Sequence, residues 1–147
     1  MEEIKLSTGI KRIAVKDEDG EVVTVLAINV ADANTINKFV KVIDDLNNIS
    51  ERCKKEAVGF DENAKDDMRQ AVKVNDIRVK YLQEIVDSLD ELFGNGTIKN
   101  VFGDIIPDEM ALVDFVEHIV PVMNTLFGKR LEVNRKRFNP NRKGARR

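Results

Sequence analysis

The residues that could take part in chemistry are few. His118 is the only histidine, and Asp114 lies four residues before it, on the same face if this segment is helical. Such a pair could orient an imidazole, but a zinc site needs further nitrogen or sulfur ligands. The pair therefore indicates a surface or boundary ion pair. Cys53 falls on an apolar helical pattern, which favours a packed thiol over a nucleophile.

Other motifs with chemical potential are weak. The neighbours Asp44-Asp45 and Asp66-Asp67 would point about 100° apart on a helix, so neither is an evident catalytic pair. Gly94-x-Gly96 lacks the spacing of a phosphate or dinucleotide loop, and Asp17-Glu18-Asp19-Gly20 lacks the later ligands of a calcium loop. We therefore expect no catalytic, cofactor or metal site, and no enzyme.

Composition predicts one cytoplasmic, folded protein. The chain has 147 residues, of which 42% are hydrophobic and 34% charged, enough for one core. No uninterrupted apolar run approaches the length of a membrane span, and the acidic start Met1-Glu2-Glu3-Ile4-Lys5 lacks the apolar core of a signal peptide. The lone Cys53 cannot form an internal disulfide and fits a reducing compartment.

The net charge of −2 hides an acidic body and a basic end. Residues 129–147 hold nine of the 24 cations and one of the 26 acids, a net +8, while the other 128 residues hold 15 cations and 25 acids, a net −10. We expect residues 134–147 to be a basic, flexible, disordered tail that contacts an acidic partner or a phosphate backbone. The alternative is a solvated tail that only aids solubility or docks on its own acidic body.

Residues 1–31 have the pattern of a β-hairpin. Asp19-Gly20 is typical of a tight turn whose two central residues need positive φ. Before this turn, Ile13 and Val15 alternate with polar or small residues. After it, every second residue lies on one face: Val22, Thr24, Leu26, Ile28 and Val30.

Residues 36–93 have the three- and four-residue spacing of helices, with Asp32 or Asn34 as a cap. Gly59, followed by Asp61, predicts a break near residues 58–61. The stripe either packs internally or forms a groove for a partner helix. Its members are Ile36, Phe39, Ile43, Leu46, Cys53, Ala57, Phe60, Ala64, Ala71, Val74, Ile77, Tyr81, Leu82, Ile85, Leu89, Leu92 and Phe93.

A double Phe-Gly turn follows. Gly94 sits where a helix end favours positive φ, and Asn95-Gly96 could extend that turn. Gly103 belongs to the second half of the turn, Asp104 offers a capping carboxylate, and Pro107 suits a first helical turn. Phe93 and Phe102 would anchor the two sides of this connection to the core.

The last predicted helix runs from Pro107 to about Arg130, and Pro121 predicts a kink or a break near Ile119. The apolar stripe of this helix is Met110, Val113, Val116, Ile119, Val120, Met123, Leu126 and Phe127. The sequence as a whole predicts an α+β, mainly α fold. It places a single domain at residues 1–133, with the hairpin in 1–31, about four helices in 32–133, and the tail in 134–147.

The segment Glu91-Leu92-Phe93-Gly94-Asn95-Gly96-Thr97 through Phe102-Gly103-Asp104 resembles tail assembly chaperones of long-tailed (siphophage-type) bacteriophages of Gram-positive hosts. The likeness covers most of the chain as an order of elements. It implies that many copies bind the long, helical tape measure protein in the host cytoplasm. They keep it soluble until tail tube subunits polymerise around it, and they are absent from the finished virion.

The resemblance also bears on partners and sites. Some similar proteins are made as a longer product through ribosomal frameshifting, and such a form would also reach the tail tube protein. The family has no catalytic residues to transfer. We expect partner contacts from the helical stripe and the basic end, with self-association through another copy's acidic body as an alternative. The candidate contact residues are Phe39, Ile43, Leu46, Phe60, Phe93, Phe102, Arg135, Lys136 and Arg137.

Two other functions stay open. The basic end could be the phosphate-binding arm of a nucleic-acid-associated regulator, although about ten net negative charges on the body would weaken such binding. With no tryptophan and one tyrosine, there is also little to stack on bases. Alternatively, the chain is a small phage-encoded adaptor that uses the same helical groove for another target.

Overall fold

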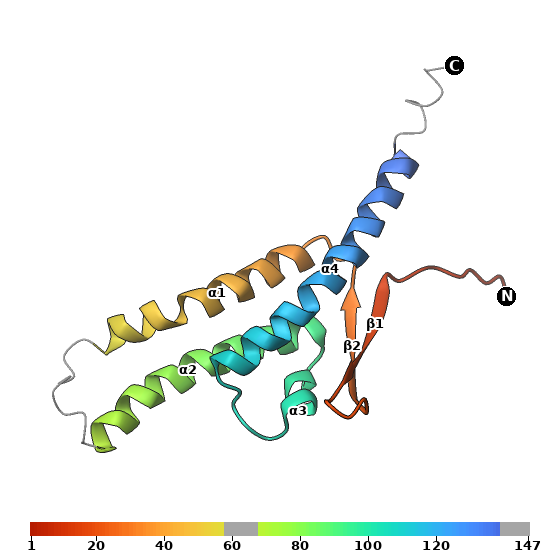
Figure 1. Ribbon diagram of the computed structural model, residues 1–147. Coiled ribbons are helices and arrows are strands. Elements are labelled where there is room, and N and C mark those ends of the chain that lie inside the picture. Colours follow the sequence, from red (N-terminus) through yellow and green to blue (C-terminus); the bar gives the residue numbers. More distant parts are fainter. Residues whose placement is uncertain (58–67, 139–147) are drawn as a thin grey trace. The chain divides into compact units, whose positions relative to one another are not determined.

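The computed structural model describes residues 1–57 and 68–138. In these ranges, a two-stranded antiparallel hairpin precedes four helices (Figure 1). The predicted α+β, mainly α fold is therefore confirmed. The elements are β1 (Ile10–Lys16), β2 (Val22–Asn29), α1 (Thr35–Glu56), α2 (Met68–Phe93), α3 (Thr97–Phe102) and α4 (Glu109–Phe138).

The chain divides into two compact units, Met1–Val113 and Asp114–Arg147. The first unit holds the hairpin, α1 to α3 and the first residues of α4, and the second begins within α4. The single domain predicted over residues 1–133 stays a prediction, because a division inside one continuous helix does not by itself separate two domains.

The hairpin turn differs from the predicted two-residue turn. Gly20 has a φ of 81°, but Asp19 does not have the positive φ that the tight turn requires. Instead, Oδ1 of Asp17 accepts hydrogen bonds from the backbone N–H groups of Asp19 (2.9 Å) and Glu21 (3.0 Å). The Asp17 carboxylate thus satisfies two backbone donors and stabilises a wider turn.

Strand β2 supplies the apolar face that its alternation predicts. Leu26, Ile28 and Val30 are 0%, 1% and 5% exposed, and the strand packs against α2 and α3. Val22 lies on the same predicted face but is 55% exposed, because it is next to the turn. The core of the first unit therefore begins in the second half of β2.

Helix α1 begins after Asn34, but not through a side-chain cap. The Asn34 side chain makes no capping hydrogen bond, and Oδ1 of Asp32 accepts the Asn34 backbone N–H at 2.9 Å. Oγ1 of Thr35 donates to the Asn29 carbonyl at 3.1 Å. The two predicted caps therefore order the turn before the helix rather than its first turn.

The buried stripe of α1 is rotated from the predicted one. Ile36 is exposed and Ile43 is half-buried, whereas Val42 is buried. Neighbouring residues point about 100° apart. Because Phe39 and Leu46 stay on the stripe, exchanging Ile43 for Val42 turns its centre by only part of that angle. The buried apolar residues of α1 are Phe39, Val42, Leu46 and Ile49.

The predicted stripe is divided between two helices, since α1 ends at Glu56 and α2 begins at Met68. The predicted break at Gly59 and Asp61 lies outside the described residues, as do Phe60 and Ala64. Within α2 the first part of the stripe is exposed and the second is buried. Its buried residues are Tyr81, Leu82, Ile85, Leu89 and Phe93.

The connection after α2 contains a short helix, α3, that was not predicted from the sequence. Gly94 has a φ of 118° and donates its N–H to the Asp90 carbonyl, so the predicted helix end is confirmed. Gly96 (φ 80°) precedes α3 and Gly103 (φ 86°) follows it. Oδ1 of Asp90 accepts the Ile98 N–H at 3.0 Å, which ties the end of α2 to the start of α3. A helix of six residues is too short to show a sequence period.

Asp108, rather than Asp104, caps α4. Oδ1 of Asp108 accepts the backbone N–H of Ala111 at 2.9 Å, while Asp104 is exposed and lies 3.8 Å from Nζ of Lys99. Pro107 is buried and precedes the cap, so its predicted place in the first helical turn is wrong by two residues. Its fixed φ shapes the entry to the helix instead.

Helix α4 runs through Pro121 as one helix of 30 residues. The predicted break near Ile119 is therefore wrong, the alternative of a kink stays a prediction, and the loss of one backbone N–H at Pro121 is tolerated. The helix also continues to Phe138, so residues 134–138, predicted as disordered, are helical. The rest of the predicted tail lies outside the described residues.

Among the described helices, α4 alone is long and apolar enough to cross a membrane by length and composition. Charged and polar residues interrupt its apolar positions, so no uninterrupted apolar run in the sequence marks this helix. The core helix of a soluble protein passes the same test of length and composition. Length and composition are therefore weak evidence for a membrane span.

Candidate partner-binding surface

Most of the predicted apolar contact residues that the structure describes are buried in the core of the first unit or half-buried. Phe39 and Leu46 are each 6% exposed and Phe93 is 2% exposed, and the two phenylalanine rings touch edge to face. Phe102 is half-buried. Buried side chains cannot contact a partner unless the core opens. The structure thus brings Phe39 and Phe93 together as core, and other residues form the accessible surface.

Helix α1 has a second apolar side that the core leaves uncovered. Ile36 and Val40 are 43% and 47% exposed, and Ile43 is half-buried. Their spacing of four and three residues places all three on one side of the helix, roughly 100° from the buried stripe. We refer to Ile36, Val40 and Ile43 as the outer stripe. Ile43 is the one predicted contact residue that belongs to it.

Helix α2 also exposes apolar side chains, at the end where it begins. Met68 is 75% exposed and Val72 is 53% exposed, one helical turn apart. Val74 is 39% exposed. Its spacing placed Val74 on the stripe that was predicted either to pack internally or to form a groove for a partner helix. The exposed start of α2 therefore adds apolar area to the surface of the helical pair.

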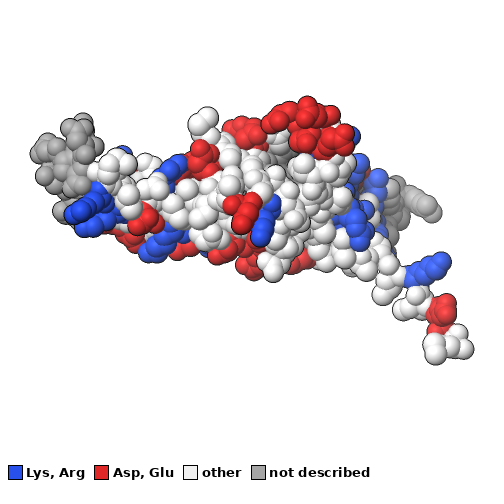
Figure 2. All heavy atoms as spheres, turned by 90° about the horizontal axis from the view of Figure 1, so that it is seen from below, with Lys and Arg blue, Asp and Glu red and all other residues white. Residues whose placement is uncertain are grey.

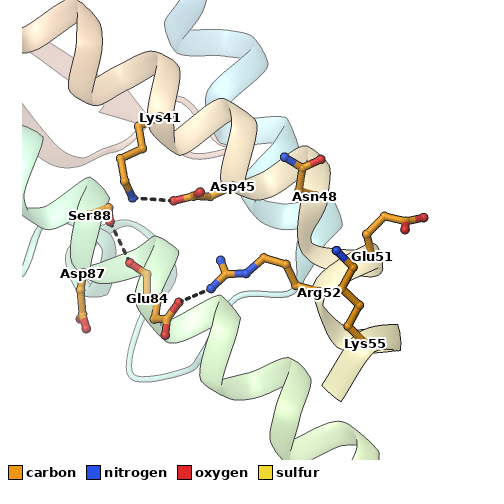
Figure 3. Close-up of a pocket in the computed structure, with 9 residues that line it drawn as sticks. All are labelled: Lys41, Asp45, Asn48, Glu51, Arg52, Lys55, Glu84, Asp87 and Ser88. Carbon is orange, nitrogen blue, oxygen red and sulfur yellow. Dashed lines mark hydrogen bonds and ion pairs between the residues drawn. The ribbon is translucent and has the colours of Figure 1, made fainter. Parts of the chain in front are cut away.

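Between α1 and α2, the surface is hollowed into an open polar groove of about 760 Å³ (Figure 3). Within α1, Nζ of Lys41 lies 2.9 Å from Oδ2 of Asp45, and Arg52 reaches across to Glu84 of α2 at 3.1 Å. Charges of both signs line the groove, which suits a polar protein surface better than one small anion or cation. Its lining residues are Lys41, Asp45, Asn48, Glu51, Arg52, Lys55, Glu84, Asp87 and Ser88.

One end of this groove is fixed by a network around Tyr81. The Arg52 guanidinium lies 4.0 Å from the centroid of the Tyr81 ring, a cation–π contact. Tyr81 donates its hydroxyl to Glu56, which raises the pKa of Tyr81 and lowers the pKa of Glu56. Nζ of Lys80 lies 3.2 Å from Oε1 of Glu56, and this bond raises the pKa of Lys80. The network links the last turn of α1 to α2.

A smaller, more apolar cavity of about 440 Å³ lies next to Cys53. Ile49, Ala57 and Val74 supply apolar lining, and Arg78 and Glu109 close one side. Nε of Arg78 donates to Oε1 of Glu109 at 2.6 Å, and Nη2 of Arg78 donates to Oε2. This two-bond pair lowers the pKa of Glu109 and raises the pKa of Arg78. The cavity could accept an apolar side chain.

The thiol in this cavity is poorly suited to nucleophilic chemistry. Burial raises the pKa of Cys53, and the nearby charge of Glu109 raises it further. The thiol is therefore protonated at neutral pH, and the thiolate is the reactive form. Cys53 is half-buried, in agreement with the predicted packing role.

His118 and Asp114 form the predicted surface pair. Nδ1 of His118 lies 3.4 Å from Oδ1 of Asp114, and both side chains are more than 70% exposed. The Asp114 backbone carbonyl lies 2.7 Å from the same nitrogen and is the main reason why the pKa of His118 is raised. Over residues 1–57 and 68–138, no group of three His, Cys, Asp or Glu side chains could hold a metal ion.

The predicted basic contacts lie on the last turns of α4, in the second unit. Arg135, Lys136 and Arg137 are exposed, and Nζ of Lys136 lies 3.3 Å from Oε1 of Glu132. The apolar contact residues belong to the first unit. On the face drawn in Figure 2, acidic side chains gather in one compact group, and elsewhere on that face both signs are interspersed. The predicted contact residues therefore fall into two sets, an apolar set in the first unit and a basic set in the second.

The most structured parts of this surface are the cross-helix contacts Arg52–Tyr81 and Arg78–Glu109, which sequence reasoning missed. The residues of the second pair are 31 positions apart. Pairing rules for charges apply three or four residues apart on one helix. No local signal could have found contacts between separate helices.

The chain belongs to a family of unknown function, DUF6673, which it matches over residues 22–147. No curated protein and no solved structure matches it.

Proposed function

We propose that this protein is a tail assembly chaperone of a long-tailed, siphophage-type bacteriophage of Gram-positive hosts. It binds the tape measure protein and keeps it soluble in the host cytoplasm during tail tube assembly. It has no enzymatic activity and is absent from the finished virion. A longer, frameshifted form would extend the same contact to the tail tube protein. The starting point is the resemblance at Glu91–Thr97 and Phe102–Asp104.

The observation that carries this proposal is the outer stripe of α1. Ile36 and Val40 expose nearly half of their side chains to water beside a core that is already filled. A long helical partner has an apolar stripe of its own, and burying the two against each other contributes about 25 cal/mol per Å² of apolar surface. The outer stripe therefore supplies what a helix-binding chaperone needs.

The polar groove supports the same proposal. Its alternating charges, Lys41 and Asp45 on α1 and Glu84 on α2, lie along a pair of helices that also exposes apolar side chains. A partner helix with apolar and charged faces can use both features, the first for affinity and the second for register. Small-molecule sites are instead concave and mostly apolar, with few charges.

Co-expression tests the proposal. The tape measure protein of the same phage is produced alone, with the wild-type chain, and with the variant Ile36→Glu/Val40→Glu. We expect the wild type to convert the tape measure protein from aggregate to soluble complex and the variant to lose most of this effect, because two charges on the outer stripe would be buried. Circular dichroism and a melting curve of the variant establish that it is folded.

The matched control is Asn37→Glu/Asn100→Glu, which adds the same two charges to exposed polar positions of α1 and α3 that lie outside the outer stripe and the polar groove. It should solubilise the tape measure protein as well as the wild type does. If the tape measure protein stays equally insoluble with and without the wild-type chain, the chaperone proposal is wrong. If the tape measure protein is insoluble with the control variant as well, the outer stripe is not the binding surface.

A further inference from the structure

The N-terminal arm, residues 1–8, is extended and exposed. The arm has no regular secondary structure, and Figure 1 shows it leading away from the hairpin. Ile4 and Leu6 are 82% and 78% exposed and lie two residues apart, the spacing that places side chains on one face of a strand. The arm therefore has the pattern of a strand that lacks a sheet.

The hairpin offers such an arm an unpaired edge. The sheet in the described chain has only two strands, and β1 pairs with β2 along one side. The Val30 N–H donates to the Gly9 carbonyl at 2.9 Å, which marks these two as a hydrogen-bonded pair. Such pairs alternate in antiparallel sheets. Ile10, Arg12 and Ala14 therefore direct their backbone N–H and C=O groups away from β2.

One face of β1 is also incompletely covered. Ile13 and Val15 lie on the inner face of the hairpin, opposite Leu26 and Thr24, but both are only half-buried. Leu26 is fully buried in the same face. A further strand beside β1 could place its own apolar side chains against Ile13 and Val15 and complete this face.

The charges of the two segments are complementary. β1 carries Lys11, Arg12 and Lys16 and no acid, whereas the arm carries Glu2 and Glu3 and a single lysine. Lysine and arginine on an edge strand disfavour pairing with another basic strand and favour an acidic one. A strand with the composition of the arm therefore fits this edge.

We propose that the arm of one copy adds to the β1 edge of a second copy as an antiparallel strand. The matching register places Leu6 opposite Ile13, Ile4 opposite Val15, and Glu3 opposite Lys16. Both apolar pairs then lie on the inner face, and the charged pair on the outer. The two-stranded sheet, marginal by itself, becomes three-stranded. Reciprocal exchange closes a two-fold dimer, independently of the proposed function.

The arm cannot reach its own β1 in this register without breaking the hairpin. Only Gly9 separates the two segments, and a fold-back would place Gly9 and Ile10 in the turn. Ile10 is paired with Asn29 of β2, and the Gly9 carbonyl is held by Val30. A side chain at Gly9 would meet Cβ of Ala31 at 2.5 Å, so this point is tightly packed. A second copy is therefore the occupant.

Cross-linking between two single-cysteine variants tests the register. Leu6→Cys and Ile13→Cys are each made in a Cys53→Ser background, mixed, and oxidised. Opposite residues in a pair without hydrogen bonds have Cα atoms about 4.5 Å apart, within disulfide range. We expect a disulfide-linked heterodimer, identified by mass spectrometry of the joined peptides. Because each chain carries one cysteine, this product can form only between copies.

Ala14→Cys is the matched control, since residue 14 lies on the other face of β1 and should cross-link to Leu6→Cys far less.

Sedimentation of the full-length chain gives the second measurement. We expect a dimer whose dissociation constant rises at least tenfold in Ile4→Glu/Leu6→Glu and stays unchanged in Val72→Glu, an exposed position on α2. A wild type that is monomeric at every concentration tested would overturn the proposal. Equal cross-linking of Leu6→Cys to residues 13 and 14 would also overturn it. So would a dimer that stays intact in Ile4→Glu/Leu6→Glu.

Discussion

Phe39 of α1 and Phe93 of α2 meet edge to face, with ring centroids 6.5 Å apart and ring planes at 75°. Phe39 lies near the start of α1 and Phe93 is the last residue of α2. The contact therefore fixes one end of the helical pair, while the Arg52–Tyr81 contact links the helices farther along α1. Gly94 follows Phe93 directly, so this contact lies beside the point where the chain leaves α2.

We predict that Phe39→Ala lowers the free energy of unfolding by about 3–5 kcal/mol, because it removes a buried ring and leaves a cavity. Phe93→Ala should cost a similar amount. The double variant should cost less than the sum of the two by about 0.5–1.5 kcal/mol, the typical coupling of an aromatic pair. Urea denaturation measures all three. Phe138→Ala, at an 82% exposed position, is the control and should change stability little.

Gly94→Val should lower the melting temperature and weaken partner binding. The φ of 118° at Gly94 is strained for any residue with a Cβ, and a β-branched residue there costs on the order of 1–2 kcal/mol or more. The substitution would also displace α3, which follows within three residues. Gly128→Ala is the contrasting control. Gly128 lies inside α4, where alanine should stabilise the helix by about 0.5–1 kcal/mol. An unchanged melting temperature for Gly94→Val would contradict the strain argument.

The parts of the fold that sequence predicts well are those with local causes. Gly94 and Gly103 have positive φ, which few other residues tolerate, and Leu26 and Ile28 alternate with exposed neighbours along a strand. Each of these signals lies within a few residues of the feature it determines. The hairpin, the long helices and the Phe-Gly turn could therefore be identified without coordinates.

The parts that sequence misses depend on competition between nearby candidates. Asp104 and Asp108 are both suitable caps, and the choice of Asp108 depends on where Pro107 packs. Val42 and Ile43 are both apolar, and only the position of α2 decides which one is buried. For the candidate site, Ile43 was identified, but Ile36 was placed on one stripe with the core residues and Val40 was not identified. On a helix with two apolar sides, the neighbouring elements decide which side chains are exposed. The spacing of the apolar residues along the helix does not decide it.

The Arg78–Glu109 pair should give a pH-dependent contribution to stability. Hydrogen bonds from Arg78 hold the pKa of Glu109 below its ordinary value of 4.5, so the charged form is favoured in the folded state. The stabilisation is therefore fully present above pH 4.5 and is lost as the pH falls through the lowered pKa. Because both side chains are about a third exposed or more, its size is on the order of 1 kcal/mol.

Denaturation of Glu109→Gln at several pH values measures this contribution. The variant should be less stable than the wild type at pH 7, and the difference should shrink as the medium becomes more acidic than pH 4. Glu132→Gln, which affects the exposed pair with Lys136, is the control and should have almost no effect. A difference between Glu109→Gln and the wild type that stays constant down to pH 2 would show that the charge of Glu109 is not its source.

The basic end of α4 should act in partner association rather than in nucleic-acid binding. We expect Arg135→Gln/Lys136→Gln/Arg137→Gln to slow association with the tape measure protein and to make the rate less sensitive to salt, because steering by opposite charges acts mainly on association. Stopped-flow measurements over a range of ionic strength give this rate. Lys54→Gln/Lys73→Gln/Lys99→Gln removes the same charge from exposed positions elsewhere and should affect the rate less.

The same two variants separate this role from that of a phosphate-binding arm. For such an arm, affinity for duplex DNA falls steeply with salt, with a slope of about 0.9 for each phosphate contacted. We expect no such complex at near-physiological ionic strength, because the body of the chain carries a net −10 outside residues 129–147. A salt-sensitive nucleic-acid complex that the triple variant in α4 abolishes and the lysine control retains would favour a nucleic-acid-associated regulator. If neither variant changes the association rate and no nucleic acid binds, the basic residues serve solubility alone.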